Sequence, residues 1–71
     1  MTYTVIEMQT NGNTTAIVPP QVYQHREDAE SRWHTIMAAA AVSHVEIHTA
    51  VILNQDGNLE RSGSYYHPQT P

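Results

Sequence analysis

The sequence predicts an α+β fold in the order ββαββ, a four-stranded antiparallel sheet with one helix packed on one face. Three observations predict it. Over residues 33–48 the spacing of apolar residues changes from helical to alternating, so a helix passes directly into a strand. Two turn sequences, Asn11-Gly12-Asn13 and Asp56-Gly57-Asn58, each separate two segments that suit a β-hairpin. The 71 residues have room for one small domain, predicted at 1–67 and followed by a flexible tail at 68–71.

The first hairpin is expected over residues 2–23. Residues 2–9 form its first strand because their side chains alternate between two faces. Residues 14–18 return antiparallel to it. Pro19 and Pro20 have no N–H to donate to a ladder, so they end or displace this strand, and residues 22–23 resume it as an edge.

The helix is expected to begin near His25 or Arg26 and to end at about Val42. Acidic residues crowd its first turns, where the helix dipole favours negative charge. Its apolar stripe consists of Ala29, Trp33, Ile36, Met37 and Ala40. Arg26 lies where helix N–H groups could help it hold a phosphate, but the neighbouring acids favour a salt bridge.

The second hairpin is expected to pair residues 44–54 with residues 59–67. A single helix covers only one face of the sheet, so the other face stays open to a partner or to solvent. With Leu59 in the core, the uncovered face is expected to carry His44, Glu46, His48, Ala50, Ile52, Ser62, Ser64 and Tyr66.

Composition excludes several classes of partner. Seven acidic residues against three arginines and no lysine give a net charge of −4, which disfavours nucleic acid and anionic membranes as partners. No apolar run approaches the roughly 20 residues of a membrane-spanning helix. The N-terminus lacks the basic start and apolar stretch of a signal peptide, so we expect a cytoplasmic protein. There is no cysteine, which excludes disulfides and thiolate metal sites.

Catalytic and metal-binding patterns are weak, and we expect a protein that is not an enzyme and has no metal or cofactor. Ser62-Gly63-Ser64 resembles a nucleophile elbow only in part, because it follows a hairpin turn and does not open a helix. His44 and His48 on one strand face would lie about 13 Å apart, too far to share one metal ion. A metal site would need a further ligand, such as His67 or a residue of a second subunit.

The small size of the chain predicts a homo-oligomer. A domain of this length buries only about 60% of the surface that its unfolded chain exposes, and this one has no disulfide to stabilise it. The uncovered face is then a subunit interface, a ligand pocket, or both. For a nucleotide-derived ligand, we expect His44, His48, Ser64 and Tyr66 to contact base and ribose, and Arg61 of the same or a neighbouring chain to meet phosphate.

Residues 26–30, 38–43, 45–53, 56–58 and 66–67 together resemble small proteins encoded by phages and prophages of Gram-positive bacteria. In those proteins an acidic, alanine-containing helix ends at a Val-Ser junction and precedes a strand with a central histidine (here His48) and a Gly-Asn hairpin. The resemblance implies a phage protein in the cytoplasm of the host cell. At the level of class it is similar to counter-defence sponges that sequester nucleotide immune signals of the cyclic ADP-ribose or cyclic dinucleotide type. The alternative is a protein-docking module, in the virion or on a host defence protein, which predicts a large apolar exposed patch.

Overall fold

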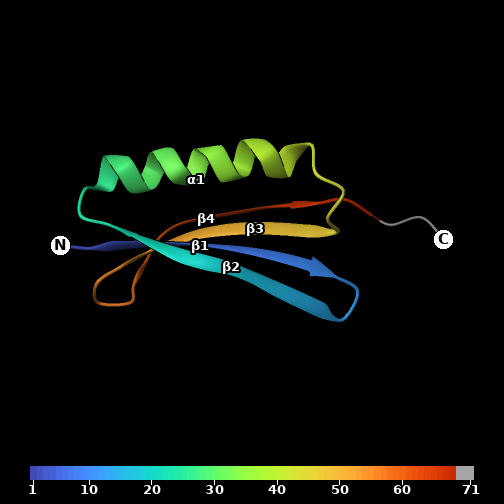
Figure 1. The fold of residues 1–71 in the computed structure, drawn as a ribbon, viewed down its shortest axis with the longest axis horizontal. Helices are drawn as coiled ribbons and strands as arrows, with labels where there is room; N and C mark the ends of the chain where they lie inside the picture. The colour runs from blue at the N-terminus through green and yellow to red at the C-terminus, as the bar shows by residue number, and fades with distance from the viewer. Residues whose placement is uncertain (69–71) are drawn as a thin grey trace.

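A computed structural model describes residues 1–68, which form four strands and one helix. They are β1 (Tyr3–Asn11), β2 (Thr14–Tyr23), α1 (Arg26–Ala41), β3 (Ile47–Asn54) and β4 (Leu59–Tyr66). The strands form one sheet in the order β2-β1-β3-β4, with every neighbouring pair antiparallel. The helix lies along one side of this sheet (Figure 1), and the predicted α+β fold is confirmed. The predicted tail at 68–71 lies outside the described residues, apart from Pro68.

The two predicted turns close the two hairpins. Gly12 and Gly57 both have positive φ, 60° and 83°, a conformation that glycine adopts without steric penalty. The helix then carries the chain from the outer strand β2 back across the sheet, so that β3 pairs with β1 in the centre. Two local hairpins are thus joined by a ladder between residues that are far apart in the sequence.

Strand β2 continues through the two prolines as an edge strand. Its pairing with β1 shifts between Val5 and Glu7, and Pro19 and Pro20 lie at this irregularity. An edge strand tolerates proline because one side of its ladder needs no N–H donor. The expected interruption of the strand at the two prolines and its resumption at residues 22–23 are therefore observed. The structure assigns the whole segment Thr14–Tyr23 to one strand.

The helix buries the apolar stripe predicted for it. Its buried residues are Ala29, Ile36 and Ala40, and they pack with Val5, Ala50 and Ile52 of the central strands. Trp33 and Met37 pack at the margin of this core. Because several of these side chains are small, the helix approaches the sheet closely over a core of limited volume.

Trp33 is fixed over the sheet by its ring nitrogen and by a glycine. Its Nε1–H donates to the carbonyl oxygen of Ala50 at 3.0 Å. A Cβ added to Gly63 would come within 2.8 Å of Trp33 Cζ2 and 3.0 Å of Met37 Cε, so only glycine leaves room for the indole there. Trp33 thus packs against the core from its margin, as its place in the predicted apolar stripe of the helix requires.

The prediction for the uncovered face is wrong for β3. His48, Ala50 and Ile52 lie beneath α1 with at most 4% of their surface exposed. The larger alternate residues, such as Val51 and Leu53, point to the other side. The physical reason is the close approach of the helix, which needs a small residue at position 50 where Trp33 rests.

Two further details of the second hairpin differ from expectation. The strand begins at Ile47 and not at His44, so His44 and Glu46 do not belong to a strand face. Glu46 is instead tied to the first hairpin turn, because its carboxylate accepts the N–H of Gly12 at 2.9 Å and its N–H donates to Asn11 Oδ1 at 3.1 Å. Leu59 is 59% exposed and does not join the core.

Within the described part of the chain, no helix has the length and apolar character needed to cross a membrane.

Candidate functional site

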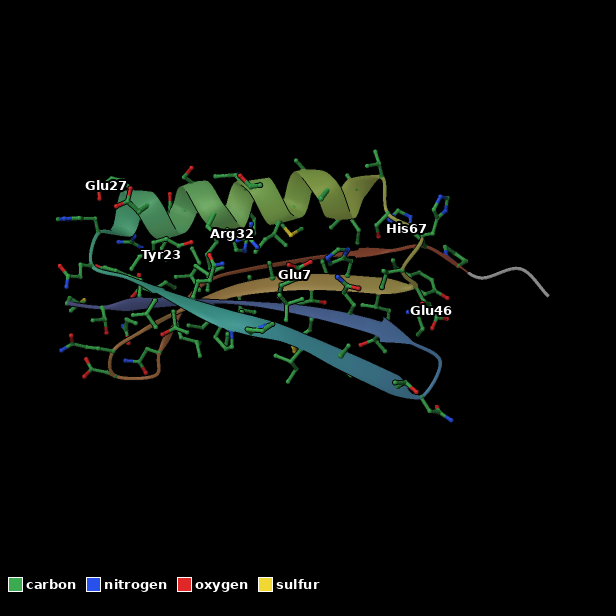
Figure 2. The ribbon with its side chains drawn as sticks, viewed as in Figure 1. Glu7, Tyr23, Glu27, Arg32, Glu46 and His67 are labelled. Carbon is green, nitrogen blue, oxygen red and sulfur yellow. The ribbon has the colours of Figure 1, made fainter. Side chains whose placement is uncertain are left out.

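A cluster of polar side chains lies beneath the helix, and we call it the buried polar cluster. It consists of Glu7 and Gln9 on β1, Arg32 on α1, Ser43 after the helix, and His48 on β3. Figure 2 shows Glu7 and Arg32 in the space between the sheet and α1. The cluster thus joins the helix, the segment that follows it and the two central strands.

His48 is the centre of this cluster. Its Nε2–H donates to Glu7 Oε2 at 2.6 Å, and its Nδ1 lies 3.1 Å from Ser43 Oγ. The same carboxylate oxygen accepts Gln9 Nε2–H at 3.1 Å, and Arg32 Nη2 lies 3.9 Å from the other oxygen. Ser43 Oγ also accepts the backbone N–H of Val45 at 3.2 Å, which directs the hydroxyl proton to His48. Both ring nitrogens of a histidine that is only 4% exposed are therefore satisfied.

The order serine, histidine, carboxylate is that of a nucleophilic relay, but its surroundings oppose acyl-transfer chemistry. Ser43 follows the C-terminus of α1, where carbonyl groups point outward and its own N–H is bonded to Ala40 O at 3.3 Å. An oxyanion needs N–H donors or positive charge, and a helix C-terminus offers the opposite sign. The arrangement suits a structural role, in which His48 locks β1 to β3 and to the junction after the helix.

The five predicted ligand-binding residues do not meet in one chain. His44 is exposed in the segment after α1, and His48 is buried beneath the helix. Arg61 is on the covered side of β4, where its guanidinium lies over the Trp33 ring. Ser64 and Tyr66 lie on the opposite face of the sheet, paired with β3 residues that point away from the helix. A single ligand cannot contact all five positions of one copy.

The three arginines are engaged with acidic residues. Arg26 Nη2 donates to Glu60 Oε1 at 2.6 Å, which confirms the predicted salt bridge. Arg61 Nη1 lies 3.5 Å from Glu30 Oε1 in addition to its contact with Trp33, 4.6 Å from the ring centroid. Among residues 1–68, no group of three or more His, Asp or Glu is placed to hold a metal ion.

The second candidate region is the side of the sheet that α1 leaves uncovered, which we call the open face. Figure 1 shows α1 on the opposite side of the sheet and no helix of residues 1–68 on this one. The strand registers and the alternation of side chains assign its members. They are Thr4, Ile6, Met8 and Thr10 of β1; Thr15, Ile17 and Val22 of β2; Ile47, Thr49, Val51 and Leu53 of β3; and Leu59, Ser62, Ser64 and Tyr66 of β4.

The open face has two chemical properties that distinguish it. None of its members is charged, although the chain carries seven acids and three arginines. It also presents larger aliphatic side chains than the face beneath the helix, and Ile17, Val22, Leu59 and Tyr66 are each about 60% exposed or more. The expectation of a polar open face is therefore wrong, except for the hydroxyls along β4. The signal for this face was the recurrence of aliphatic residues at every second position, Ile6 and Met8 in β1 and Val51 and Leu53 in β3.

Comparison of the chain with models of known protein families, with curated proteins and with solved structures finds no match.

Proposed function

We propose that the protein is a non-enzymatic, homo-oligomeric binding protein, and that the open face is where one copy packs on another. The observation that carries this proposal is the distribution of aliphatic side chains. The sheet turns its larger apolar residues, including Met8, Val51 and Leu53, away from α1. Burying them against a second sheet would supply the second half of a core that one copy builds on one side alone.

The extent of the open face suits a dimer. Four strands about 4.8 Å apart and about eight residues long give a surface of roughly 19 by 26 Å, or about 500 Å² before side-chain relief is counted. Standard interfaces remove about 600–1,000 Å² of accessible surface from each partner. Because protruding side chains add to the flat area, the accessible surface of the open face reaches this range. Two twisted sheets pack face to face with their strands about 30° apart.

A second copy fits this face better than an unrelated partner because its polar groups are self-complementary. Every polar side chain on the open face ends in a hydroxyl, which both donates and accepts hydrogen bonds. In a two-fold interface the same patch faces itself, so such groups can pair with their own kind. A charged partner patch would gain nothing from this face, and two copies can meet there without burying any charged side chain.

The proposal is tested by changing Ile17, which is 61% exposed, to glutamate. Because the side chain is exposed in one copy, Ile17→Glu should leave the fold of that copy intact. Loss of isoleucine burial removes about 2 kcal/mol in each of two copies, or about 4 kcal/mol together, which weakens the dimer about a thousandfold. We expect sedimentation to give a wild-type mass of at least twice 8.0 kDa and a clear decrease for the variant.

The matched control is Ala38→Glu, which adds the same charge to an exposed position of the helix. It should assemble as the wild type does. A wild-type protein that stays at 8.0 kDa at high concentration would reject the dimer and leave the open face for a different protein, the docking alternative. Equal assembly of wild type and Ile17→Glu would also reject the interface.

The more specific expectation, sequestration of a nucleotide-derived signal by a phage protein, stays a prediction. Since Ser64 and Tyr66 lie on the face opposite to His48 and Arg61, a shared site would have to combine residues from two copies. Thermal unfolding in the presence of cyclic dinucleotides and cyclic ADP-ribose isomers measures this, because a ligand that binds the folded state raises the midpoint. No increase with any of these ligands would argue against the prediction.

A further inference from the structure

The two outer strands of the sheet are protected to different degrees. An edge strand presents unpaired N–H and C=O groups, and proteins commonly block such edges with proline, bulges or inward charges. Strand β2 has both Pro19 and Pro20 and an irregular register beside them. Strand β4 contains no proline, and its register irregularity and both of its charges are confined to the segment Leu59–Arg61. Its segment from Ser62 to Tyr66 pairs regularly with β3 and carries no charge. The blocked edge and the unblocked edge thus belong to opposite sides of one small sheet.

The hydrogen-bond pattern shows which groups of β4 point outward. The N–H of His67 donates to the carbonyl of Glu46 at 2.7 Å, which continues the ladder between β4 and β3. In an antiparallel pair the backbone groups of alternate residues point to the same side. Gly63 therefore directs its N–H and C=O toward β3, whereas Ser62 and Ser64 direct theirs to the free edge.

A second β4 can meet this edge in a two-fold antiparallel register centred on Gly63. Ser62 then lies opposite Ser64 of the second copy, so the outward backbone groups exchange hydrogen bonds and the serine hydroxyls are neighbours. The two glycines face each other as a non-hydrogen-bonded pair, in which Cα atoms approach to about 4.5 Å. Gly63 already lacks a side chain because Trp33 occupies the space above it.

The charges of β4 also agree with this register. Arg61 comes to lie opposite Tyr65 of the second copy, an aromatic ring that is 42% exposed in one copy. Glu60 lies opposite Tyr66, so no like charges face each other across the axis. The helix packs chiefly on β3, and β3 strands of the two copies would be about 14 Å apart, which leaves room for both helices.

We infer that β4 is a second self-association edge, at which two copies join their sheets into one continuous eight-stranded sheet with Gly63 at the two-fold axis. This contact uses the backbone edge and does not depend on the open face. Used together, with their two-fold axes intersecting at right angles, the two contacts would produce a tetramer of dihedral symmetry.

The inference is tested with Ser64→Pro and its control Ser64→Ala. Proline removes the outward N–H that β3 does not use, whereas alanine keeps it and removes the same hydroxyl. We expect Ser64→Pro to halve the mass measured by sedimentation, and Ser64→Ala to retain the wild-type mass. Equal masses for Ser64→Pro and wild type would overturn the edge contact.

Combination with Ile17→Glu separates the two contacts. If both exist, Ser64→Pro and Ile17→Glu each halve the tetramer and the double variant is a monomer. If only the edge exists, Ile17→Glu has no effect and Ser64→Pro alone gives a monomer. If only the open face is used, Ser64→Pro changes nothing.

Amide hydrogen exchange on the wild-type protein gives a readout that requires no proline. The N–H groups of Ser62 and Ser64 exchange rapidly at a free edge, whereas pairing should slow them by about 100-fold or more. Their protection should persist in the folded Ile17→Glu protein. Rapid exchange of both amides while Gly63 is protected would overturn the inference.

Discussion

The strongest test of the buried polar cluster is removal of the Glu7 carboxylate. In Glu7→Leu, the Nε2–H of His48 loses its acceptor at 2.6 Å while the ring stays buried. An unsatisfied buried donor costs about 1–3 kcal/mol. Loss of the partly exposed Arg32 pair adds at most about 1 kcal/mol. We therefore expect the free energy of unfolding to decrease by about 1–4 kcal/mol.

The measurement is urea unfolding followed by Trp33 fluorescence at one fixed protein concentration, because assembly raises apparent stability. For a domain of this size each kcal/mol corresponds to about 4–8 °C in the midpoint of thermal unfolding, so a decrease of about 4–32 °C should accompany it. Glu7→Gln is the control. Its amide oxygen still accepts from His48, and we expect a loss of only about 1 kcal/mol.

A double variant, Glu7→Leu with His48→Leu, distinguishes a lost hydrogen bond from a lost side chain. Removing both partners leaves no unsatisfied imidazole, so the double variant should be more stable than the sum of the single changes by about 1–2 kcal/mol. The reasoning is refuted if Glu7→Leu unfolds within about 0.5 kcal/mol of the wild type, or if the two changes are additive.

Three further changes probe the contact between helix and sheet, each measured by urea unfolding followed by circular dichroism, because one of them removes the single tryptophan. Gly63→Ala places a Cβ 2.8 Å from Trp33 Cζ2, and overpacking should destabilise the fold by about 1–3 kcal/mol; a neutral result would contradict the close contact. Trp33→Phe removes the side-chain donor to the carbonyl of Ala50, and we expect a loss of about 1–2 kcal/mol, whereas unchanged stability would mean that the ladder bond between β3 and β4 alone suffices for this carbonyl. Ile52→Ala, at a position 1% exposed, should cost about 2–5 kcal/mol, and a loss below about 1 kcal/mol would deny it a place in the core.

The order and type of the elements could be predicted because local signals agree with the fold. Acidic residues at its start and alanines at its end locate α1 to within about a residue. Asn-Gly and Asp-Gly mark both turns, and both glycines have the positive φ that such turns need. These signals act over a few residues and do not depend on which elements pack together.

The face assignment of β3 could not be predicted because both of its faces contain apolar residues. Alternation separates Val51 and Leu53 from Ala50 and Ile52, but it does not say which set meets the helix. That choice depends on two contacts between residues far apart in the sequence. One is the packing of Trp33 over Ala50 and Gly63, and the other is the hydrogen bond between His48 and Glu7 on another strand. Neither is visible in the spacing of one strand.

The predicted ligand-binding residues were grouped on the assumption that His48 shares the uncovered face with Ser64 and Tyr66. Because this assumption is wrong, the structure places these residues on opposite faces of the sheet. Ser64 and Tyr66 lie on the open face as expected, because β4 alternates regularly on both sides of Gly63, whereas the irregularity between Leu59 and Arg61 turns Leu59 away from the core. His48 lies instead on the covered side, as do Ala50 and Ile52 of the same strand. A partner for a buried histidine can come from any strand, and sequence spacing alone does not identify it.

The strand order has a consequence for how the chain reaches its native state. Strand β1 is synthesised early, yet its inner neighbour β3 comes only after the helix, and the N–H of Thr2 bonds to Gln55 across 53 positions. During translation the β1–β2 hairpin is therefore present before β3, so the inner edge of β1 has no strand to pair with, and an isolated hairpin is only marginally stable. Such a chain closes its largest loop late and should refold more slowly than a helical protein of equal length. Because β4 completes the sheet and covers one side of β3, removal of β4 should destabilise the elements that precede it.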